Sequence, residues 1–436
     1  MMRPTATGRL NAEGHRIRPA TDDRDAAVCR YPARSHAHDP PMTATALPEP
    51  DAAARAHSDR LAALIRAEIA AAGGAIPFSR FMELALYAPG LGYYSAGATK
   101  FGESGDFVTA PELGPTFAEC VAEAMAPVLR TLGPQAEFLE LGGGSGAFAE
   151  AALRRLAELD ALPARYAILE PSADLRARQR ERLTGSLPAA LSARLHWLDG
   201  PPQAHWRGVL FANEVLDALP TPRFSIHGGE VYEEHVALDE HGGFIRVDRP
   251  ADALVAGAVR HVEAYLEAPF AEGYRSEILP QLPYWLQAVG GMIEAGAMLF
   301  VDYGYPRAEY YLPERRDGTL VCHYRHRAHT DPYRLPGLQD LTAFVDFTAL
   351  AEAGLGAGFD FAGYCSQANF LIGNGLQGRI AAIETLPDEI ERHRRRQEIK
   401  RLTLPGEMGE RFQVMGFVRG VTLGAAFALG DLSRRL

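Results

Sequence analysis

The chain has 436 residues, of which 47% are hydrophobic and 23% charged, the balance of an ordinary globular protein. The formal net charge of -11 argues against a broad basic surface for nucleic acid, and no run of ~18 uncharged apolar residues predicts a membrane span. Cys29, Cys120, Cys322 and Cys365 form no CxxC pair, so the sequence indicates neither a zinc site nor a disulfide framework and favours a reducing compartment.

The first 50 residues differ from the rest of the chain. They hold seven arginines and six acidic residues without apolar periodicity, which predicts a disordered leader at residues 1–50. Mitochondrial transit peptides are usually poor in acids, and no apolar signal-peptide core is visible. Because Met42 lies just before the ordered-looking sequence, our hypothesis is that Met42, rather than Met1, is the natural start.

Residues 51–135 are predicted to form an N-terminal region of helices and loops that covers the site. An amphipathic helix is expected from Ala52 to Ala72, where two glycines end it. Shorter helices are expected at Arg80–Tyr87 and Thr116–Leu132. Residues 89–111, between these two helices, are rich in glycine and aromatic residues, which indicates a loop.

From residue 136 to the end at 436, strands and helices alternate, which is typical of an open, mostly parallel sheet. Apolar runs predict five strands and two later ones: Phe138–Leu141, Tyr166–Leu169, Leu195–Leu198, Val209–Ala212, Met298–Val301, Phe359–Tyr364 and Phe412–Val418. The expected fold class is therefore α/β, with a seven-stranded Rossmann-like sheet.

Two long segments interrupt this alternation. An insertion at about residues 221–295 should contain a β-hairpin over Arg223–Val247, with glycine turns, and helices at Asp252–Leu266 and Ser276–Glu294. Residues 303–337 are rich in aromatic residues and histidine and are predicted to form a loop. Loops of this length usually have a function. Further helices are expected at Leu338–Ala353 and Asp388–Leu402.

The strongest local signal is the run Glu-Leu-Gly-Gly-Gly-Ser-Gly at residues 140–146, between a predicted strand and a helix. Glycines let the backbone turn tightly and approach a ligand closely. The run alone is ambiguous, because Gly142, Gly144 and Ala147 also fit the dinucleotide pattern. Glu170 ends the next strand, where a carboxylate would bind the ribose of either cofactor.

Three further strand ends favour S-adenosylmethionine over a dinucleotide. Glu140 would repel a pyrophosphate, whereas it suits a cofactor with a sulfonium and an ammonium group. Asp199 closes the third strand, where it would meet the adenine amino group, and Phe211 to Glu214 close the fourth, where methyltransferases place acceptor-facing residues. Simpler readings stay open: Asp199 as a turn residue, Glu170 as a solvent-facing strand end and Asn213 as a helix cap.

With these motifs in view, the chain resembles the MidA-like S-adenosylmethionine-dependent methyltransferases over residues 75–419. The motifs that carry the resemblance are Ile76-Pro77-Phe78, Tyr87-Ala88-Pro89, Gly92-Tyr93-Tyr94, residues 105–112, residues 140–146, residues 166–172, residues 213–220, Asp302-Tyr303-Gly304, Gly318-Thr319-Leu320, residues 323–326, Asp331-Pro332, residues 339–347 and Met408-Gly409-Glu410. One departure is Gly143, where the family often has proline, and it leaves the cofactor turn more flexible.

The resemblance implies a class I methyltransferase fold and S-adenosyl-L-methionine as cofactor, and the cysteine spacing gives no reason to expect a metal. Its mitochondrial members methylate a protein arginine and assist respiratory complex I assembly, so a protein substrate, such as a respiratory-complex subunit, is the expected partner. The candidate cofactor-binding residues are Gly105, Thr109, Glu140, Gly142, Gly144, Gly146, Glu170, Ser172, Asp199, Phe211 and Asn213.

An arginine acceptor would need carboxylates to hold its delocalised cation. Glu214 and Asp217 are the best candidates, since a spacing of three residues can bring both to one side of a helical turn. With Asn213, which would position acceptor or cofactor, they are the predicted catalytic residues. The simpler reading is that both acids only charge a helix start.

Five residues are candidates for acceptor binding. Asp106 and Phe107 lie in the glycine-rich loop, and His323 or His326, in the aromatic loop, would act as a base unless both are surface residues. Asp346, in a predicted helix with apolar neighbours, is either an acceptor contact or a buried polar partner.

Other function classes stay as alternatives. A nucleic-acid amine methyltransferase is disfavoured because residues 213–216 lack a platform on which a flipped base could stack. A small-molecule methyltransferase, a non-catalytic assembly factor that keeps the cofactor fold, and a dinucleotide oxidoreductase remain. We expect a cytoplasmic location for a bacterial protein and the mitochondrial matrix for a eukaryotic one, with a homodimer as an open alternative to a monomer.

Overall fold

A mixed sheet organises the described part of the chain, which in this computed structural model is residues 47–96 and 108–436. Its strands are β2 Glu137–Leu141, β3 Arg165–Leu169, β4 Leu195–Leu198, β5 Trp206–Asn213, β10 Ile293–Tyr305, β14 Val345–Asp346, β15 Asp360–Ser366 and β16 Phe412–Arg419. The main path runs β15-β16-β10-β5-β2-β3-β4, and β14 pairs with β10 beside it. Only β16 runs antiparallel to its neighbours on this path. This arrangement confirms the predicted α/β fold class.

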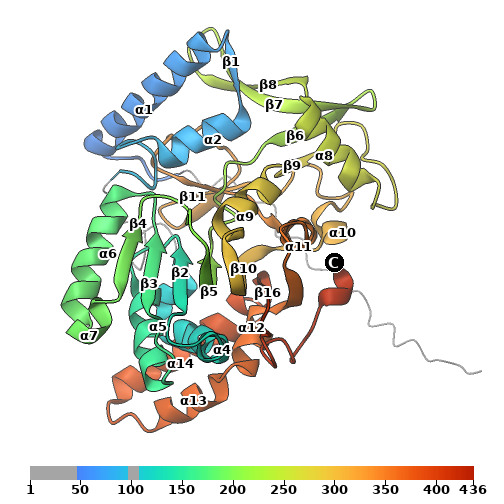
Figure 1. Cartoon of the computed structure of the whole chain (residues 1–436). Helices are drawn as coiled ribbons and strands as arrows, with labels where there is room; N and C mark the ends of the chain where they lie inside the picture. The colour runs from blue at the N-terminus through green and yellow to red at the C-terminus, as the bar shows by residue number, and fades with distance from the viewer. Residues whose placement is uncertain (1–46, 97–107) are drawn as a thin grey trace, which may run out of the picture. The chain divides into compact units, whose positions relative to one another are not determined.

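Strand residues alternate between two apolar cores, one on each face of the sheet. In β5, Val209 and Phe211 enter the core beneath α4 and α5, whereas Leu210 and Ala212 enter the core beneath α9 and α11. The helices that cover the sheet are α4 Thr116–Leu132, α5 Ala147–Glu158, α6 Ala173–Ser186, α7 Ala189–Ser192, α9 Leu282–Gly290, α11 Phe347–Gly356, α12 Gln367–Gly373, α13 Leu376–Glu384, α14 Glu389–Thr403 and α15 Met408–Arg411. The sheet is therefore buried on both sides (Figure 1).

A second sheet is built mainly from the segment between β5 and β10. It contains β1 Ala75–Pro77, β6 Arg223–His227, β7 Glu230–Leu238, β8 Phe244–Pro250 and β9 Arg275–Glu277, and α8 Ala253–Glu263 packs against it. The glycine turns are as predicted, because Gly228, Gly229 and Gly242 all have positive φ. The predicted helix at Ser276–Glu294 is shorter than expected, since its first residues form β9.

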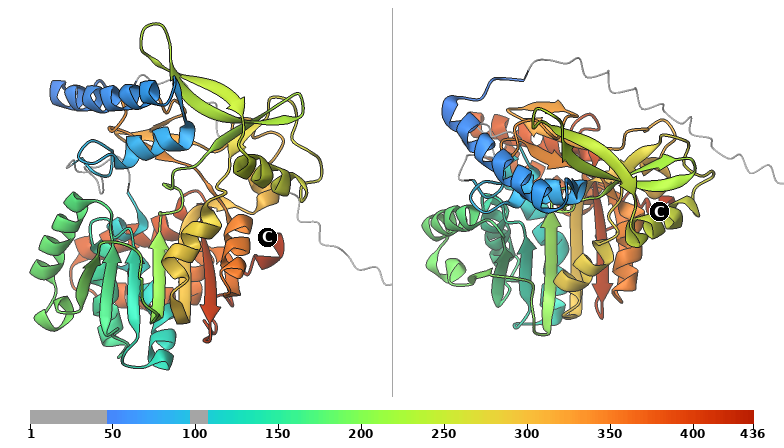
Figure 2. Two further views of the ribbon diagram at one scale, coloured as in Figure 1. Left: turned by 45° about the horizontal axis from the view of Figure 1, so that its top comes forward. Right: turned by 90° about the horizontal axis from the view of Figure 1, so that it is seen from above.

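Two N-terminal helices and a small third sheet lie beside this second sheet. The helices are α1 Ala52–Ala71 and α2 Phe78–Tyr87, and the strands are β11 Val321–Tyr324, β12 Arg327–His329 and β13 Asp340–Thr342. They share an apolar core that includes Leu61, Phe81 and Leu341. Figure 2 shows α1 and α2, in blue, on the same side of the main sheet as the strands of the insertion.

The structure corrects two predictions for residues 303–353. The expected loop at residues 303–337 contains α10 Arg307–Tyr310 and the hairpin of β11 and β12. The expected helix at Leu338–Ala353 is wrong in its first half, because residues 340–342 pair with β11 and residues 345–346 pair with β10. These strands form through long-range pairing, which overrides the local helical pattern.

The predicted leader at residues 1–50 lies almost wholly outside the described residues, and with it the question of Met42. At the other end, η1 Ser433–Arg435 follows the last strand. Within residues 47–96 and 108–436, none of the helices joins the length and the apolar run that a bilayer crossing requires.

Candidate active site

The glycine run forms a tight turn between β2 and α5. Gly142, Gly144 and Gly146 have φ angles of +65°, +52° and +84°, a region that side chains other than glycine rarely adopt. A Cβ on Gly142 would also lie 3.0 Å from Cγ2 of Val215. The turn thus needs glycine for its backbone shape, and it brings the backbone to the carboxyl end of the sheet, where ligands of open α/β sheets bind.

Glu140 lies buried within β2, two residues before this turn. The hydroxyl of Tyr166 donates a hydrogen bond of 2.8 Å to its Oε2 atom. Burial raises the pKa of Glu140 to about 8, against the opposing effect of that hydrogen bond. Burial disfavours the ionised form of Glu140, and a nearby cation would stabilise that form. The sulfonium and ammonium groups of the predicted cofactor are such cations.

Glu170, at the end of β3, is held by two donors. The backbone N–H of Ser172 donates to its Oε1 atom at 3.0 Å, and Nε2 of Gln179 donates to its Oε2 atom at 3.2 Å. Gln179 also donates to the carbonyl of Gly144 at 2.9 Å and accepts from Nε1 of Trp197. Gln179 therefore ties the acid to the glycine turn, a role that the sequence analysis missed.

Four other predicted cofactor residues have different surroundings. Ser172 caps α6 through a hydrogen bond from the N–H of Leu175, and Thr109 is buried just before α3 Ala110–Leu113. Asp199 is 92% exposed and pairs with Arg176 at 2.7 Å. The ring of Phe211 lies in the core and stacks on Phe148. Gly105 lies outside the described residues, as do Asp106 and Phe107.

The predicted catalytic residues lie together at the ends of β5 and β10. Nδ2 of Asn213 donates to Oε1 of Glu214 at 3.0 Å, while Oδ1 of Asn213 is buried without a hydrogen-bond partner among the described residues. Glu214 has a φ of +52°, so its backbone is strained. Asp302, on β10, accepts from the backbone N–H groups of Leu216 and Asp217 at 3.0 and 3.3 Å.

Asp302 was not predicted as a site residue, and neither were four others that join this cluster. The hydroxyl of Tyr303 hydrogen-bonds to Asp217. Tyr94 donates to both carboxylate oxygens of Asp340 at 3.0 Å, and Tyr87 donates to the carbonyl of Ala218 at 2.9 Å. The rings of Tyr87 and Tyr94 stack with centroids 5.6 Å apart. All of these residues occur in the motifs of the family resemblance, which was the available signal.

Burial raises the pKa values of three of the acids gathered here. The pKa of Glu214 rises to about 8, through removal from water and the nearby charge of Asp217. The pKa of Asp217 rises to about 6 through burial, and that of Asp302 is raised well above its ordinary value through burial and the charges of Asp217 and Glu214. We refer to Glu214, Asp217, Asp302 and Asp340 as the acid cluster. Such a cluster favours a bound cation, and Glu214 and Asp217 can exchange protons near neutral pH.

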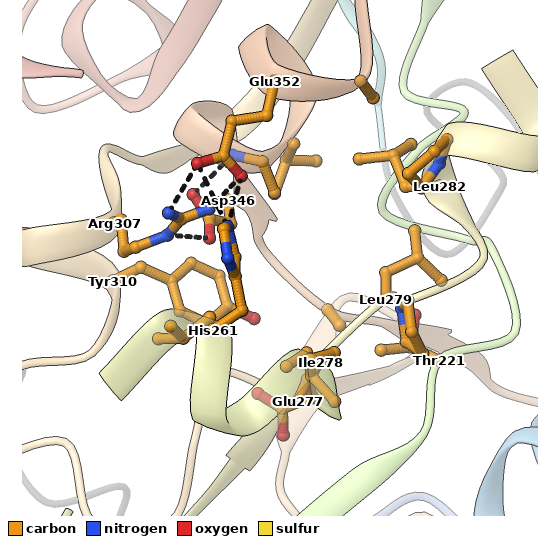
Figure 3. A pocket seen from close by; sticks show the side chains of 18 of the residues that line it. Thr221, His261, Glu277, Ile278, Leu279, Leu282, Arg307, Tyr310, Asp346 and Glu352 are labelled. Atoms are coloured by element: carbon orange, nitrogen blue, oxygen red, sulfur yellow. Dashed lines mark hydrogen bonds and ion pairs between the residues drawn. The ribbon is translucent and has the colours of Figure 1, made fainter. Parts of the chain in front are cut away.

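The remaining predicted acceptor residues are spread over a wider area. His323 lies directly opposite Asp340 in the pairing of β11 with β13, so the two side chains share a face beside the acid cluster. His326 is exposed at the turn of the β11–β12 hairpin. Asp346 is the N-cap of α11, where it accepts from the N–H groups of Thr348 and Ala349, and it lines a separate cavity (Figure 3).

The residues around the glycine turn fit the predicted cofactor. A side chain at Gly142 would crowd Val215, Glu170 offers oriented carboxylate oxygens to a ribose diol, and Oδ1 of Asn213 offers an unused acceptor. Because Glu140 adds a second acid, this set of groups suits a cation better than a pyrophosphate.

Comparisons with known proteins point to the same class of enzyme. Residues 120–365 match the family model described as "Putative S-adenosyl-L-methionine-dependent methyltransferase". A crystal structure of a Burkholderia thailandensis protein bound to S-adenosyl-homocysteine has a TM-score of 0.83 and 45% sequence identity, over 89% of this chain and 100% of that chain. A second structure from Burkholderia thailandensis has a TM-score of 0.80, 44% identity and the same coverage.

Two relatives carry more specific names. The Drosophila melanogaster protein arginine methyltransferase NDUFAF7 homolog, mitochondrial, is 29% identical over 86% of this chain and 88% of its own length. The Danio rerio protein arginine methyltransferase NDUFAF7, mitochondrial, is 29% identical over 78% of this chain and 83% of its own length.

Proposed function

The chain belongs to the MidA-like family of S-adenosyl-L-methionine-dependent methyltransferases, and we propose that it methylates an arginine side chain of a protein. The observation that carries the proposal is the acid cluster at the carboxyl ends of β5 and β10. Four buried or half-buried carboxyl groups next to a cofactor site form a receptor for a cation. The names of the Drosophila and zebrafish relatives support arginine as that cation.

The glycine turn and Glu170 would hold the cofactor in this proposal. Glu170 would accept hydrogen bonds from the ribose hydroxyls, and the turn from Gly142 to Gly146 would admit the methionine part close to the backbone. When bound, S-adenosyl-L-methionine supplies a methyl group already activated by the sulfonium. The N–H groups at the start of α5 and the carboxyl of Glu140 would be the remaining groups that contact the cofactor.

The acid cluster would orient the acceptor and receive its proton. A guanidinium is planar and delocalised, so carboxylates that accept hydrogen bonds from it also fix which nitrogen faces the methyl group. Methyl transfer leaves a proton on that nitrogen. Asp217, with a pKa of about 6, is ionised near neutral pH and can accept it, while Glu214, with a pKa of about 8, keeps its own proton there and would help to orient the acceptor. Positioning of this kind lowers a barrier by roughly 7–11 kcal/mol in favourable cases.

The stacked rings of Tyr87 and Tyr94 support a delocalised acceptor cation. Burial and the charges of Asp340, Asp217 and Glu170 raise the pKa of Tyr87, so its hydroxyl is close enough to feel both the cofactor acid and the acid cluster. Aromatic faces attract guanidinium groups by cation–π interaction, in addition to hydrogen bonds from carboxylates. The combination of rings and acids favours arginine over an uncharged acceptor.

The first experiment is calorimetric titration with S-adenosylmethionine, S-adenosylhomocysteine and NAD, followed by methyl transfer from labelled cofactor to protein. We expect the first two ligands to bind and NAD not to bind, and we expect the label in methylarginine after acid hydrolysis. Glu214→Gln should bind S-adenosylhomocysteine as the native protein does and lose most of the transfer. Label in another residue type would contradict the arginine proposal, and preferential binding of NAD would contradict the cofactor.

A further inference from the structure

A cavity of about 550 Å³ lies between α8 and α11, away from the glycine turn. No residue of the run 140–146 lines it, and neither does any member of the acid cluster. Its mouth is formed by exposed residues such as Gly257 and His261 of α8 and Glu352 of α11. The volume is that of a pocket for a small ligand or for one or two side chains of a partner.

One side of the cavity is apolar. Leu279 and Leu282 lie on the side opposite Arg307 (Figure 3), Leu216 also lines the cavity, and Leu216 and Leu282 are buried in the core. Leu254 lines the cavity and is 43% exposed, and Tyr265, whose ring centroid lies 5.1 Å from that of His261, is 68% exposed. Exposed apolar side chains beside a pocket are typical of a protein–protein contact, and tyrosine is enriched at such contacts.

The other side of the cavity is charged. Arg307 donates to both carboxylate oxygens of Glu352, at 2.8 and 2.6 Å, and lies 3.4 Å from Asp346 (Figure 3). Burial opposes ionisation of Glu352, but the hydrogen bonds and charge of Arg307 outweigh it and lower its pKa. Nε2 of His261 also lies 3.4 and 3.3 Å from the two oxygens of Glu352, so two acids face one guanidinium and one imidazole. The two carboxylates still have more lone pairs than these contacts use. The wall therefore favours a group that is positively charged or donates hydrogen bonds.

The inner end of the cavity is separated from the acid cluster by a single layer of backbone. The side chain of Leu216 lines the cavity, while its N–H donates to Asp302 and the next residue is Asp217. Ala343 also lines the cavity, and its N–H donates to the carbonyl of Asp217 at 2.9 Å. A molecule that fills the cavity would thus lie beside the place where the acceptor is expected.

We propose that this cavity docks the acceptor protein, taking one of its apolar side chains against Leu216 and Leu282 and a neighbouring lysine or arginine against Glu352. The proposal rests on the proposed function for the statement that the acceptor is a protein. Docking at a second point next to the acid cluster would let the enzyme select one protein segment among many arginines, because a second contact raises the effective concentration of the first.

Gly257 offers a direct way to close the mouth. It lies inside α8, where glycine is a poor helix former, and a Cβ there would meet no atom within 4 Å. Gly257→Leu should therefore fold, because leucine favours the helix and its side chain enters open space. Gly257→Ala is the matched control, since it makes the same change in helix propensity while leaving the mouth open.

The test follows the methyl NMR signals of leucine and valine in the full chain saturated with S-adenosylhomocysteine. The probes are acetyl-Lys-Leu-Lys-amide and acetyl-Glu-Leu-Glu-amide, which share the apolar residue and differ in charge. The basic peptide should shift the signals of Val262, Leu279 and Leu282 and bind about fivefold more tightly than the acidic one. Glu352→Gln should reduce that ratio, and Gly257→Leu, unlike Gly257→Ala, should abolish the shifts.

Three results would overturn the docking site: no shift of these methyl signals, equal binding of the two peptides, or unchanged binding to Gly257→Leu. Binding of S-adenosylhomocysteine is measured in the same samples. If the cofactor product binds and the peptide does not, the docking site fails while the proposed function stands. If the peptide binds in the cavity and labelled cofactor gives no methylarginine, the docking site stands and arginine as the acceptor fails.

Discussion

Glu214 combines two features that destabilise a folded chain, a left-handed backbone and a carboxyl withdrawn from water. Its φ of +52° lies in a region that few residues other than glycine adopt, and its pKa is raised to about 8. Strain of this kind concentrates at functional sites, where the surrounding structure holds it in place. The partners that hold Glu214 are Asn213, through its side-chain amide, and Ala110, through its backbone N–H.

The raised pKa of Glu214 predicts how stability depends on pH. Between its ordinary pKa of 4.5 and about 8, the folded protein keeps a proton that the unfolded chain has lost. The free energy of unfolding must therefore fall as pH rises through this window. We expect Glu214→Gln, which cannot ionise, to be more stable than the native protein at pH 8.5 and to differ little from it at pH 4.5. Urea denaturation at the two pH values measures this difference.

Asp199→Asn is the surface control for this prediction, because the Asp199 side chain is 92% exposed. It should leave the slope of stability against pH as it is in the native protein. If Glu214→Gln were instead less stable than the native protein at pH 8.5, the Glu214 carboxyl would be ionised in the folded protein and stabilised by a positively charged or hydrogen-bonding partner.

The glycine turn gives a second prediction at the residue scale. Gly142→Ala places a Cβ on a residue with φ of +65° and 3.0 Å from Val215. The left-handed backbone alone costs roughly 1–2 kcal/mol, so we expect the affinity for S-adenosylhomocysteine to fall about tenfold or more by calorimetry. Gly185→Ala is the control, since Gly185 lies in α6 with open space around it and should bind normally. Unchanged affinity of Gly142→Ala would show that the ligand does not need this turn.

At the scale of elements, α2 and β13 together complete the acid cluster from outside the main sheet. The end of α2 carries Tyr87, the following turn carries Tyr94, and β13 begins with Asp340. The three are joined by the hydrogen bond from Tyr94 to Asp340 and by the stacked tyrosine rings. The end of α2 and the turn after it therefore contribute side chains to the candidate site.

The substitution Asp340→Asn removes the negative charge of Asp340 but keeps its hydrogen bond from Tyr94, so it distinguishes the two effects. Asparagine can still accept from Tyr94, so the free energy of unfolding and the affinity for S-adenosylhomocysteine should change little. Loss of the negative charge should lower kcat/KM for the acceptor by about 10–100-fold, because a hydrogen bond to a charged group contributes roughly 1.5–3 kcal/mol. Labelled methyl transfer and thermal melting measure the two effects. If Asp340→Asn transferred the methyl group at the native rate, the charge of Asp340 would not act on the acceptor, and its role would be only to accept the hydrogen bond from Tyr94.

Long elements with a strong local pattern were predictable from the sequence, and short ones that depend on distant partners were not. The helix at Thr116–Leu132 has the predicted bounds, and the helix predicted at Ala52–Ala72 ends one residue earlier, because apolar periodicity and flanking turns mark both locally. β13 and β14 have three and two residues and exist only through pairing with β11 and β10. Asp340 and Asp302 could not be assigned from spacing, since they reach Tyr94 and Leu216 across 246 and 86 residues.

At the scale of the whole molecule, the described residues 47–96 and 108–436 belong to one compact unit, although they contain several sheets and four apolar cores. A buried ion network links the inserted sheet to the aromatic segment. Arg223 donates to Glu277 at 2.9 Å, to Glu234 at 3.0 Å and to the carbonyl of Asp317 at 2.8 Å. Removing one partner of such a network typically costs about 3–5 kcal/mol, so these regions should not open independently.

Three buried thiols test whether the unit unfolds as a whole. Cys120 lies in α4, Cys365 in β15 and Cys322 in β11, and burial raises the pKa of the first two to about 12 and that of Cys322 further. Because the thiolate is the reactive form, none of the three should react with a thiol reagent in the native state. In a Cys29→Ser background, mass spectrometry along a urea series should show all three becoming labelled at the same denaturant concentration. Earlier labelling of Cys322 alone would mean that the β11 region opens before the main sheet, and the acid cluster would then be completed by a segment that can move away from it.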